Sequence, residues 1–195
     1  SRFSVCDKLE ESIEESLQKA ESLRQSILKR AFEGKLVPWD PNDEPAGELL
    51  KRIAAEKKRL GIKSKPLPEI GEEERPFDLP DGWEWVRLGN LVSQMGSGST
   101  PRGGKKVYQD SGIKFLRSQN VWNEGLRLNG VACISPEIHK KMKRTTVFPR
   151  DILLNITGAS IGRSSLVPDD FDTGNVSQHV SIIRLISPEI RHFIH

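Results

Sequence analysis

The chain has 195 residues and a formal net charge of +3, with 35% hydrophobic and 29% charged residues. This length allows one full domain with an appendage or two small units, and the mean hydropathy of −0.50 suits a protein with a highly charged, exposed element. No apolar run reaches the roughly 20 residues that cross a bilayer, and no secretory signal opens the sequence, so we expect a cytoplasmic protein with no membrane contact.

Positive charge is concentrated in one part of the sequence. Residues 100–165 contain twelve Lys or Arg and four Asp or Glu, an excess of +8, whereas residues 1–76 sum to −1. A local excess of this kind indicates a surface that binds a polyanion, and a solubilising face is the alternative.

The first segment has the pattern of a long helix. Apolar residues recur at helical spacing over residues 5–32, and no Pro or Gly interrupts them before Gly34. About three heptads predict a coiled-coil-type helix whose narrow apolar stripe must pack against another helix. Ser16 and Arg30 fall on the seam and weaken a tight coil. The residues predicted to face the partner helix are Leu9, Ile13, Ala20, Leu23 and Ile27.

A second helix and a linker follow. Turn residues precede a predicted helix over residues 46–60 that ends at Gly61, and residues 61–76 are rich in Pro, Gly and charge. We therefore predict a helical spacer or dimerisation region over residues 1–60, a linker over residues 61–76 and a separate domain over residues 77–195.

The last region has the pattern of a β-rich domain, because short apolar or β-branched runs alternate with turn residues. We predict a short helix over residues 88–95. The predicted strands cover residues 83–88, 113–116, 130–134, 151–156, 164–167 and 179–185. The expected fold class is α+β, with a long N-terminal coiled-coil-type helix followed by a mixed, β-dominated domain.

Residues 158–162 match G-x-S-x-G, the turn that presents a nucleophilic serine, here Ser160, in many hydrolases. That turn needs a helix after the serine, and further sheet elements that place an acid and a histidine. Residues 163–168 instead have the pattern of a strand and turn, and Asp172 and His179 share one loop. We expect no catalytic residue, keep a serine hydrolase as the alternative, and interpret the glycines as permitting positive φ and close backbone approach.

Metal and cofactor signatures are missing from the sequence. Cys6 and Cys133 lie far apart and are expected to be free thiols, and the four histidines show no metal-ligand spacing. No phosphate-binding or dinucleotide-binding glycine motif is present. We therefore expect no metal and no cofactor.

Polar and basic side chains on predicted loops suit nucleic-acid contact. Lys, Arg and hydroxyl groups bind phosphates, and Arg, Gln and Asn read purine edges, although such residues also form solvated faces and cap turns. The predicted phosphate contacts are Lys105, Lys106, Lys140, Lys141, Lys143 and Arg144. The predicted base readers are Arg102, Arg117, Gln119 and Asn120. The remaining predicted contacts are the hydroxyl-bearing Ser97, Ser99, Thr100 and Ser118.

Several segments resemble the specificity subunit of type I restriction-modification enzymes. They are residues 23–38 with 40–45, 79–89, 112–120, and 151–162 with 175–179, in the order that the family uses. The resemblance implies that residues 5–34 are the family's spacer helix, that residues from 77 onward form a target recognition domain, and that residues 157–162 are its glycine-rich turn.

The resemblance also implies a function. The family's subunit is not an enzyme: it binds double-stranded DNA and docks methyltransferase and restriction subunits, which carry out the chemistry. It normally has two recognition domains and two antiparallel spacer helices, whereas this sequence has one of each. We therefore expect a fragment or a truncated subunit whose recognition domain is incomplete at its C-terminus. The simplest replacement for the second helix is the same helix of another copy, which predicts a homodimer. The alternatives are a serine hydrolase and a helical dimerisation scaffold with an incidental basic domain.

Overall fold

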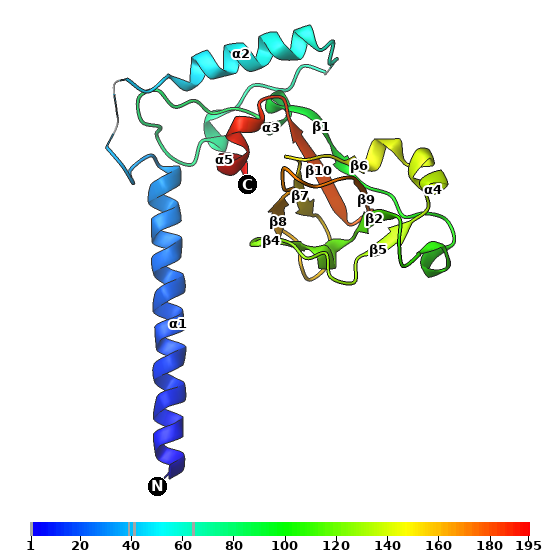
Figure 1. Ribbon diagram of the computed structural model, residues 1–195. Helices are drawn as coiled ribbons and strands as arrows, with labels where there is room; N and C mark the ends of the chain where they lie inside the picture. The colour runs from blue at the N-terminus through cyan, green and yellow to red at the C-terminus, as the bar shows by residue number, and fades with distance from the viewer. Residues whose placement is uncertain (1, 39, 41, 64) are drawn as a thin grey trace. The chain divides into compact units, whose positions relative to one another are not determined.

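The computed structural model describes residues 2–38, 40, 42–63 and 65–195 (Figure 1). The chain forms two compact units, the first made of residues 1–51 and 68–86 and the second of residues 52–67 and 87–195. Residues 77–86 lie in the first of these units, and the second helix contributes to both. The predicted division into three regions stays a prediction. In the described part of the chain, no helix combines the length and the apolar character needed to span a membrane.

A single long helix, α1 (Arg2–Phe32), dominates the first unit and confirms the predicted coiled-coil-type helix. Gly34, with φ +65°, ends it in the left-handed conformation that glycine adopts without strain. The amide of Gly34 donates to Ala31 O at 3.0 Å and that of Lys35 to Arg30 O at 2.8 Å. This pair of bonds is a Schellman motif, which satisfies carbonyls that the last helical turn would leave open.

The rest of the first unit folds back on the chain that follows α1. Pro80 packs directly against Gly34, and the amide of Ala46 donates to Gly82 O at 2.8 Å. Trp85 packs on Phe77 with ring centroids 5.1 Å apart, and residues 83–87 have no regular structure. The strand predicted over residues 83–88 is therefore wrong, because its aromatic side chain packs on another aromatic ring instead of alternating along a sheet.

The second helix, α2 (Ala46–Arg59), ends as predicted near Gly61, which has φ +64°. Ile53 is its buried apolar residue. In the second unit, Lys57 Nζ on this helix donates to Gly89 O at 3.1 Å. The described residues 65–86 connect α2 to the β-rich part of the chain, and η1 (Glu72–Glu74) is their only regular element.

The second unit contains two four-stranded sheets and a two-stranded ribbon (Figure 1). The first sheet is antiparallel throughout, in the order β1 (Val92–Ser97), β10 (Val180–Leu185), β7 (Ile152–Asn155) and β8 (Ser164–Leu166). The second sheet has the order β5 (Ala132–Ile134), β2 (Ile113–Leu116), β9 (Gly174–Val176) and β6 (Thr146–Val147). Only its β2–β9 pair is parallel among the described strands. The ribbon pairs β3 (Val121–Trp122) with β4 (Gly125–Leu126).

Short helices connect these strands. They are α3 (Leu88–Leu91), η2 (Gly104–Val107), η3 (Ser118–Asn120), α4 (Pro136–Lys141), η4 (Lys143–Thr145), η5 (Pro188–Ile190) and α5 (Arg191–Ile194). The strands predicted at β2, β5, β7, β8 and β10 are confirmed. The helix predicted over residues 88–95 ends early, because Val92 pairs with Leu185 and starts β1. Strands β1, β3, β4, β6 and β9 were not predicted.

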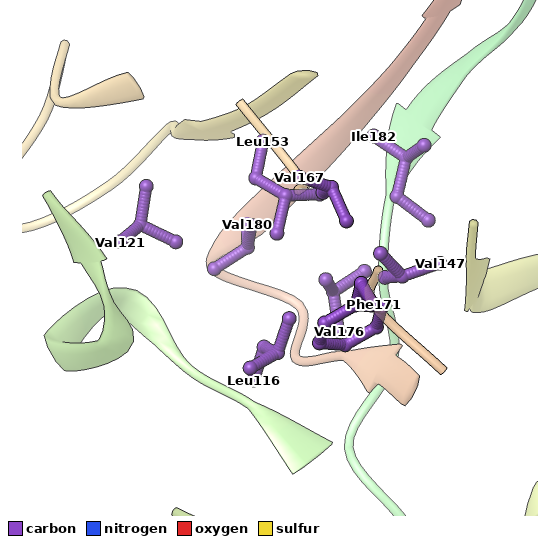
Figure 2. Close-up of a cluster of buried hydrophobic side chains, with 9 residues drawn as sticks. All are labelled: Leu116, Val121, Val147, Leu153, Val167, Phe171, Val176, Val180 and Ile182. Carbon is purple, nitrogen blue, oxygen red and sulfur yellow. The ribbon is translucent and has the colours of Figure 1, made fainter. Parts of the chain in front are cut away.

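The main core of the second unit lies between the two sheets. Leu116 and Val176 from the second sheet meet Leu153, Val180 and Ile182 from the first, and all are at most 1% exposed (Figure 2). A smaller cluster packs Phe115 and Ile134 under Met142, which follows α4. Burial of these side chains explains why β2, β5, β7 and β10 could be recognised from apolar runs.

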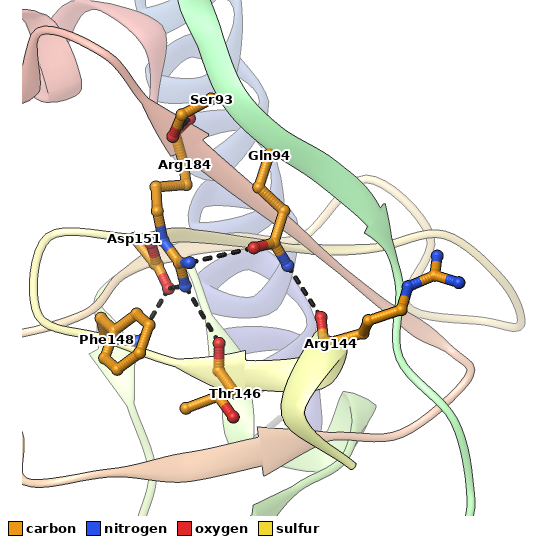
Figure 3. Close-up of polar contacts among 7 residues, drawn as sticks. All are labelled: Ser93, Gln94, Arg144, Thr146, Phe148, Asp151 and Arg184. Carbon is orange, nitrogen blue, oxygen red and sulfur yellow. Dashed lines mark hydrogen bonds and ion pairs between the residues drawn. The ribbon is translucent and has the colours of Figure 1, made fainter. Parts of the chain in front are cut away.

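A polar network also joins the two sheets (Figure 3). Arg184 of β10 binds the Asp151 carboxylate with two nitrogens, and its Nη2 also donates to Thr146 O of β6 at 3.0 Å. Gln94 of β1 accepts from Arg184 at 3.0 Å and donates to Arg144 O at 2.8 Å. The network therefore holds the turn that carries Lys143 and Arg144 against β1.

Candidate nucleic-acid interface

The glycine-rich turn connects β7 to β8 in an antiparallel hairpin. The Asn155 amide donates to Arg163 O at 2.8 Å, and the Gly162 amide donates to Asn155 O at 2.9 Å. Gly158 and Gly162 have φ of +78° and +86°, which confirms the positive φ predicted for them. In the described chain, no other group lies within 4 Å of a Cβ built on either glycine, so the chain itself does not make the expected close approach.

This hairpin does not have the geometry of a nucleophile turn. The residue after Ser160 continues into a turn and then β8, whereas a hydrolase would place a helix there. The serine, histidine and acid that a hydrolase would need have other partners. Ser160 Oγ accepts from Asn155 Nδ2 at 3.1 Å, and His179 Nδ1 lies 2.6 Å from Thr157 Oγ1. Asp172 accepts from Lys114 at 2.6 Å. The serine hydrolase alternative therefore has no structural support.

The turn instead forms one wall of a hollow of about 550 Å³. The lining residues carry hydroxyl, amide, imidazole, guanidinium and indole groups and no carboxylate: Ser118, Gln119, Trp122, Thr157, Gly158, Ala159, Ser160, Arg163 and His179. The β7–β8 turn supplies one wall, and η3 with β3 supplies the other. The buried Asn155 links these walls, because its Nδ2 donates to Ser118 O at 2.9 Å and to Ser160 Oγ at 3.1 Å.

Beside this hollow, the indole ring of Trp122 is stacked between two arginines. The guanidinium carbons of Arg127 and Arg163 lie 3.4 and 3.9 Å from the ring centroid. Two guanidinium groups this close to one centroid would overlap on a single face, so they occupy opposite faces. Trp122 Nε1 donates to Gln119 O at 2.8 Å, which fixes the ring within its plane.

Two of the predicted contact residues, Ser118 and Gln119, line the hollow. The side chain of Gln119 is exposed, whereas Asn120 is only 2% exposed. Asn120 Oδ1 accepts from the Arg117 amide at 3.0 Å, and its Nδ2 donates to Arg127 O at 2.8 Å. Asn120 is a structural cap in this fold, since both ends of its amide bind backbone, and its contact with a base stays a prediction.

Arg117, also predicted to read a base, is half-buried. Its guanidinium carbon lies 5.5 Å from the Tyr108 ring centroid. Its Nε is buried and has no hydrogen-bond partner within the described residues. Arg117 thus packs at the end of β2, and its Nε donor is unused within the described residues.

The predicted phosphate contacts lie on other exposed segments. Lys105 and Lys106 are in η2, while the second group is in α4 and η4: Lys140, Lys141, Lys143 and Arg144. No carboxylate oxygen of the described chain lies within 4.0 Å of any of these six. Figure 1 shows α4 and β8 on opposite sides of the unit, so the structure does not gather all predicted contacts at the hollow.

The loop after β1 carries the other predicted contacts. Ser97, Ser99, Thr100 and Arg102 are exposed. Gly98 anchors this loop, because its amide donates to Val180 O at 2.9 Å and a Cβ there would overlap the backbone of Val176 and Ser177. The loop is therefore tied to β9 and β10, with its hydroxyls left accessible.

The sequence reasoning missed Trp122, Arg127 and Arg163 as a group. Each lies within or beside a segment for which the sequence predicts a contact or a turn. However, Arg163 and Trp122 are far apart in the sequence, so no pattern of neighbouring residues connects them. The available signal was the excess of Lys and Arg over residues 100–165 together with a single tryptophan among them.

The apolar stripe of α1 is a second candidate interaction surface. Its predicted partner-facing side chains are exposed, with Leu9 at 58%, Ile13 at 59% and Leu23 at 62%. Exposed leucines and isoleucines in a row are unfavourable in water, and such a row marks an interaction surface. Cys6 on the same helix and the buried Cys133 are both free thiols, as predicted.

Two curated proteins from Escherichia coli are related to the chain. It is 38% identical to the specificity subunit of the type I restriction enzyme EcoAI over 141 residues, which cover 70% of this chain and 23% of that subunit. It is 50% identical to the specificity subunit of the type I restriction enzyme EcoEI over 86 residues, which cover 42% of this chain and 14% of that subunit. The chain thus spans about a quarter or less of the length of the curated relatives that it matches.

No family model matches the sequence. Two solved structures are similar to the chain. One comes from work on complex assembly and conformational transition of the type I R-M system, with a TM-score of 0.43 and 18% identity over 88% of this chain and 36% of that chain. The other is the HsdS subunit from Thermoanaerobacter tengcongensis, with a TM-score of 0.41 and 17% identity over 90% of this chain and 34% of that chain.

Proposed function

We propose that this chain, which belongs to the family of type I restriction enzyme specificity subunits, recognises a DNA sequence on behalf of a restriction-modification complex. The observation that carries the proposal is the 38% identity to the EcoAI specificity subunit over 70% of the chain. Because the match covers 23% of that subunit, the DNA binding and the subunit docking of the whole protein are proposals for this chain.

The chemistry of the second unit supports DNA as the ligand. Exposed lysines and arginines without carboxylate partners attract phosphates, and this attraction supplies most of non-specific DNA affinity. Gln119 presents an exposed amide at the edge of the hollow, and an amide of this kind can pair with the N6 and N7 groups of adenine. We assign phosphate contact to the basic segments and base contact to the loops beside them, and we assign catalysis to partner subunits.

The proposed partners are double-stranded DNA, a methyltransferase subunit, a restriction subunit and a second copy of the chain. The stripe of α1 supports a helical partner, because isolated amphipathic helices gain little from propensity alone. An antiparallel pair of α1 helices would carry one recognition unit at each end and so present two identical DNA-reading surfaces.

The test is binding of fluorescent double-stranded DNA to the purified chain, alone and with methyltransferase subunits, over a range of salt concentrations. We expect affinity that falls steeply with salt and a preferred sequence that methylation mapping of the assembled complex identifies. Absence of DNA binding in both settings would refute the proposal. Binding of a helical partner without any DNA binding would favour the scaffold alternative, and ester hydrolysis by the chain would favour the hydrolase alternative.

A further inference from the structure

We propose that Arg127, Trp122 and Arg163 form a clamp for phosphodiester groups of one DNA strand. This inference rests on the proposed function and deepens it by assigning a backbone-binding site. The three residues are called the arginine–tryptophan stack below.

In the stack, the Trp122 ring contacts both guanidinium groups without accepting a hydrogen bond from either. A guanidinium that lies flat on an indole face is attracted through its plane, while its N–H groups point outward in that plane. In the described chain, neither Arg127 nor Arg163 donates a side-chain hydrogen bond, and neither forms an ion pair. Both donor forks are therefore available for an anion with several acceptor oxygens, and a phosphodiester matches that fork.

The surroundings favour an anion at this place. The hollow beside the stack has no carboxylate in its lining, and Thr157 and Ser160 contribute hydroxyl groups to its wall. Two positive charges on either side of one ring repel each other, so the free stack is electrostatically unfavourable unless solvent or an anion compensates. Glu124, which lies close in sequence, forms no ion pair with either arginine in the described structure.

The stack is also fixed relative to a proposed base reader. Trp122 Nε1 binds the carbonyl of Gln119, and the Gln119 side chain lies at the hollow. A DNA strand whose phosphate binds the two arginines would therefore have its bases held in a fixed position relative to Gln119. Asn155 acts as a positioning residue, because its Nδ2 joins the two walls of the hollow through Ser118 O and Ser160 Oγ.

The experiment measures DNA affinity against salt for the full chain and five variants. In Arg127→Gln with Arg163→Gln, both donor forks are lost, so the slope of log K against log salt should flatten by about 0.9 for each lost contact. In Arg127→Lys with Arg163→Lys, both charges remain but the forks are lost, and affinity should fall roughly tenfold with a nearly unchanged slope. In Trp122→Leu, the ring that orients both guanidinium groups is lost, and affinity should fall roughly fivefold.

The fourth variant, Arg150→Gln, is the matched control. Arg150 is an exposed arginine of the same unit whose charge is already balanced by Asp169 at 3.0 Å, so this variant should bind as the parent does. Trp122→Leu added to the double glutamine variant should cause no further loss, because the ring acts through the arginines. Circular dichroism of each variant checks that the fold is retained.

The outcomes separate this inference from the proposed function. If the parent binds DNA and both double variants bind with parental affinity and slope, the clamp is refuted while DNA recognition stands. If the lysine variant matches the parent and only the glutamine variant weakens, a general charge effect replaces the clamp. If the parent binds no DNA alone or with methyltransferase subunits, the proposed function fails and the clamp fails with it.

Discussion

Arg184 and Asp151 form a two-point ion pair at the junction of the two sheets. Arg184 Nε and Nη2 each donate to a different carboxylate oxygen at 2.7 Å, and the Asp151 side chain is 1% exposed. The Phe148 amide donates to the same carboxylate at 2.8 Å, while its ring lies 4.4 Å from the guanidinium carbon (Figure 3). The pair therefore connects β10 with the turn between β6 and β7.

Replacing Arg184 with Met should destabilise the second unit strongly. The change leaves the buried Asp151 carboxylate without its cation, and breaking a buried pair in this way costs about 3–5 kcal/mol. Urea unfolding followed by circular dichroism measures the loss. Arg150→Gln, which removes an exposed arginine, should change the free energy of unfolding by less than about 1 kcal/mol. Equal stabilities of the two variants would show that the Arg184 pair contributes no more than a surface pair.

Neutralising the predicted phosphate contacts should flatten the salt dependence of DNA binding. Replacing all six of Lys105, Lys106, Lys140, Lys141, Lys143 and Arg144 with Ala should lower the slope of log K against log salt by about 0.9 for each true contact. The control replaces three exposed α1 lysines, Lys8, Lys19 and Lys29, and should leave the slope unchanged. A parental slope in the sextuple variant would remove these residues from the interface.

Gln119→Ala should alter base preference without altering stability. Within the described residues, the exposed side-chain amide has no hydrogen-bond partner to lose. The variant should therefore relax the preference at one base position at a cost of roughly 1–3 kcal/mol for the cognate site. Competition binding with duplexes changed at single positions measures this effect. An equal loss for every duplex would make Gln119 a positioning residue.

Asn120→Ala is the matched comparison, because the side chain of Asn120, the residue next to Gln119, is buried. Removing the amide leaves the Arg127 carbonyl and the Arg117 amide without their partner, which should cost about 1–3 kcal/mol of stability. Base preference should stay parental at temperatures where the variant is folded. A change at one base position in the folded variant would restore Asn120 to the base-reading set.

Charged substitutions in the α1 stripe should produce a monomer. Ile13→Asp with Leu23→Asp places two carboxylates in the proposed helix–helix seam, where they would be desolvated. Light scattering measures the oligomeric state at protein concentrations of roughly tens of micromolar, where weak dimers form. It should give a dimer for the parent and a monomer for the variant. The control, Gln18→Asp with Gln25→Asp, adds the same charge to the outer face and should remain dimeric. A monomeric parent would instead favour a helix that docks on the methyltransferase subunit.

Acid should weaken the contact between Lys114 and Asp172. The hydrogen bond from Lys114 holds the pKa of the Asp172 carboxyl below its usual value, with help from the Thr173 amide. Stability from a lowered carboxyl pKa is present above the unfolded pKa and is lost as pH falls through the folded pKa, so the window lies below about pH 4. The Asp172 side chain is 64% exposed, so Asp172→Asn should cost less than about 1 kcal/mol at pH 7. Below about pH 3, urea midpoints of variant and parent should converge.

Local patterns determined the elements whose signals lie within a few residues. The heptad spacing and Gly34 specify α1, and Gly61 ends α2, because helix periodicity and left-handed caps are properties of adjacent residues. Apolar runs identified β2, β7 and β10 because those strands are buried. The positive φ of Gly158 and Gly162 also followed from the sequence.

Tertiary contacts decided the rest. Strand β9 is a short Gly-Asn-Val segment with no strand pattern, and it becomes a strand because β2 and β6 supply hydrogen bonds on both sides. The Asn120 amide is a structural cap because the chain returns to place Arg127 O beside it. Arg163 and Trp122 meet because the β7–β8 hairpin turns back toward β3. Such contacts join residues far apart in the sequence, and no periodicity of neighbouring residues encodes them.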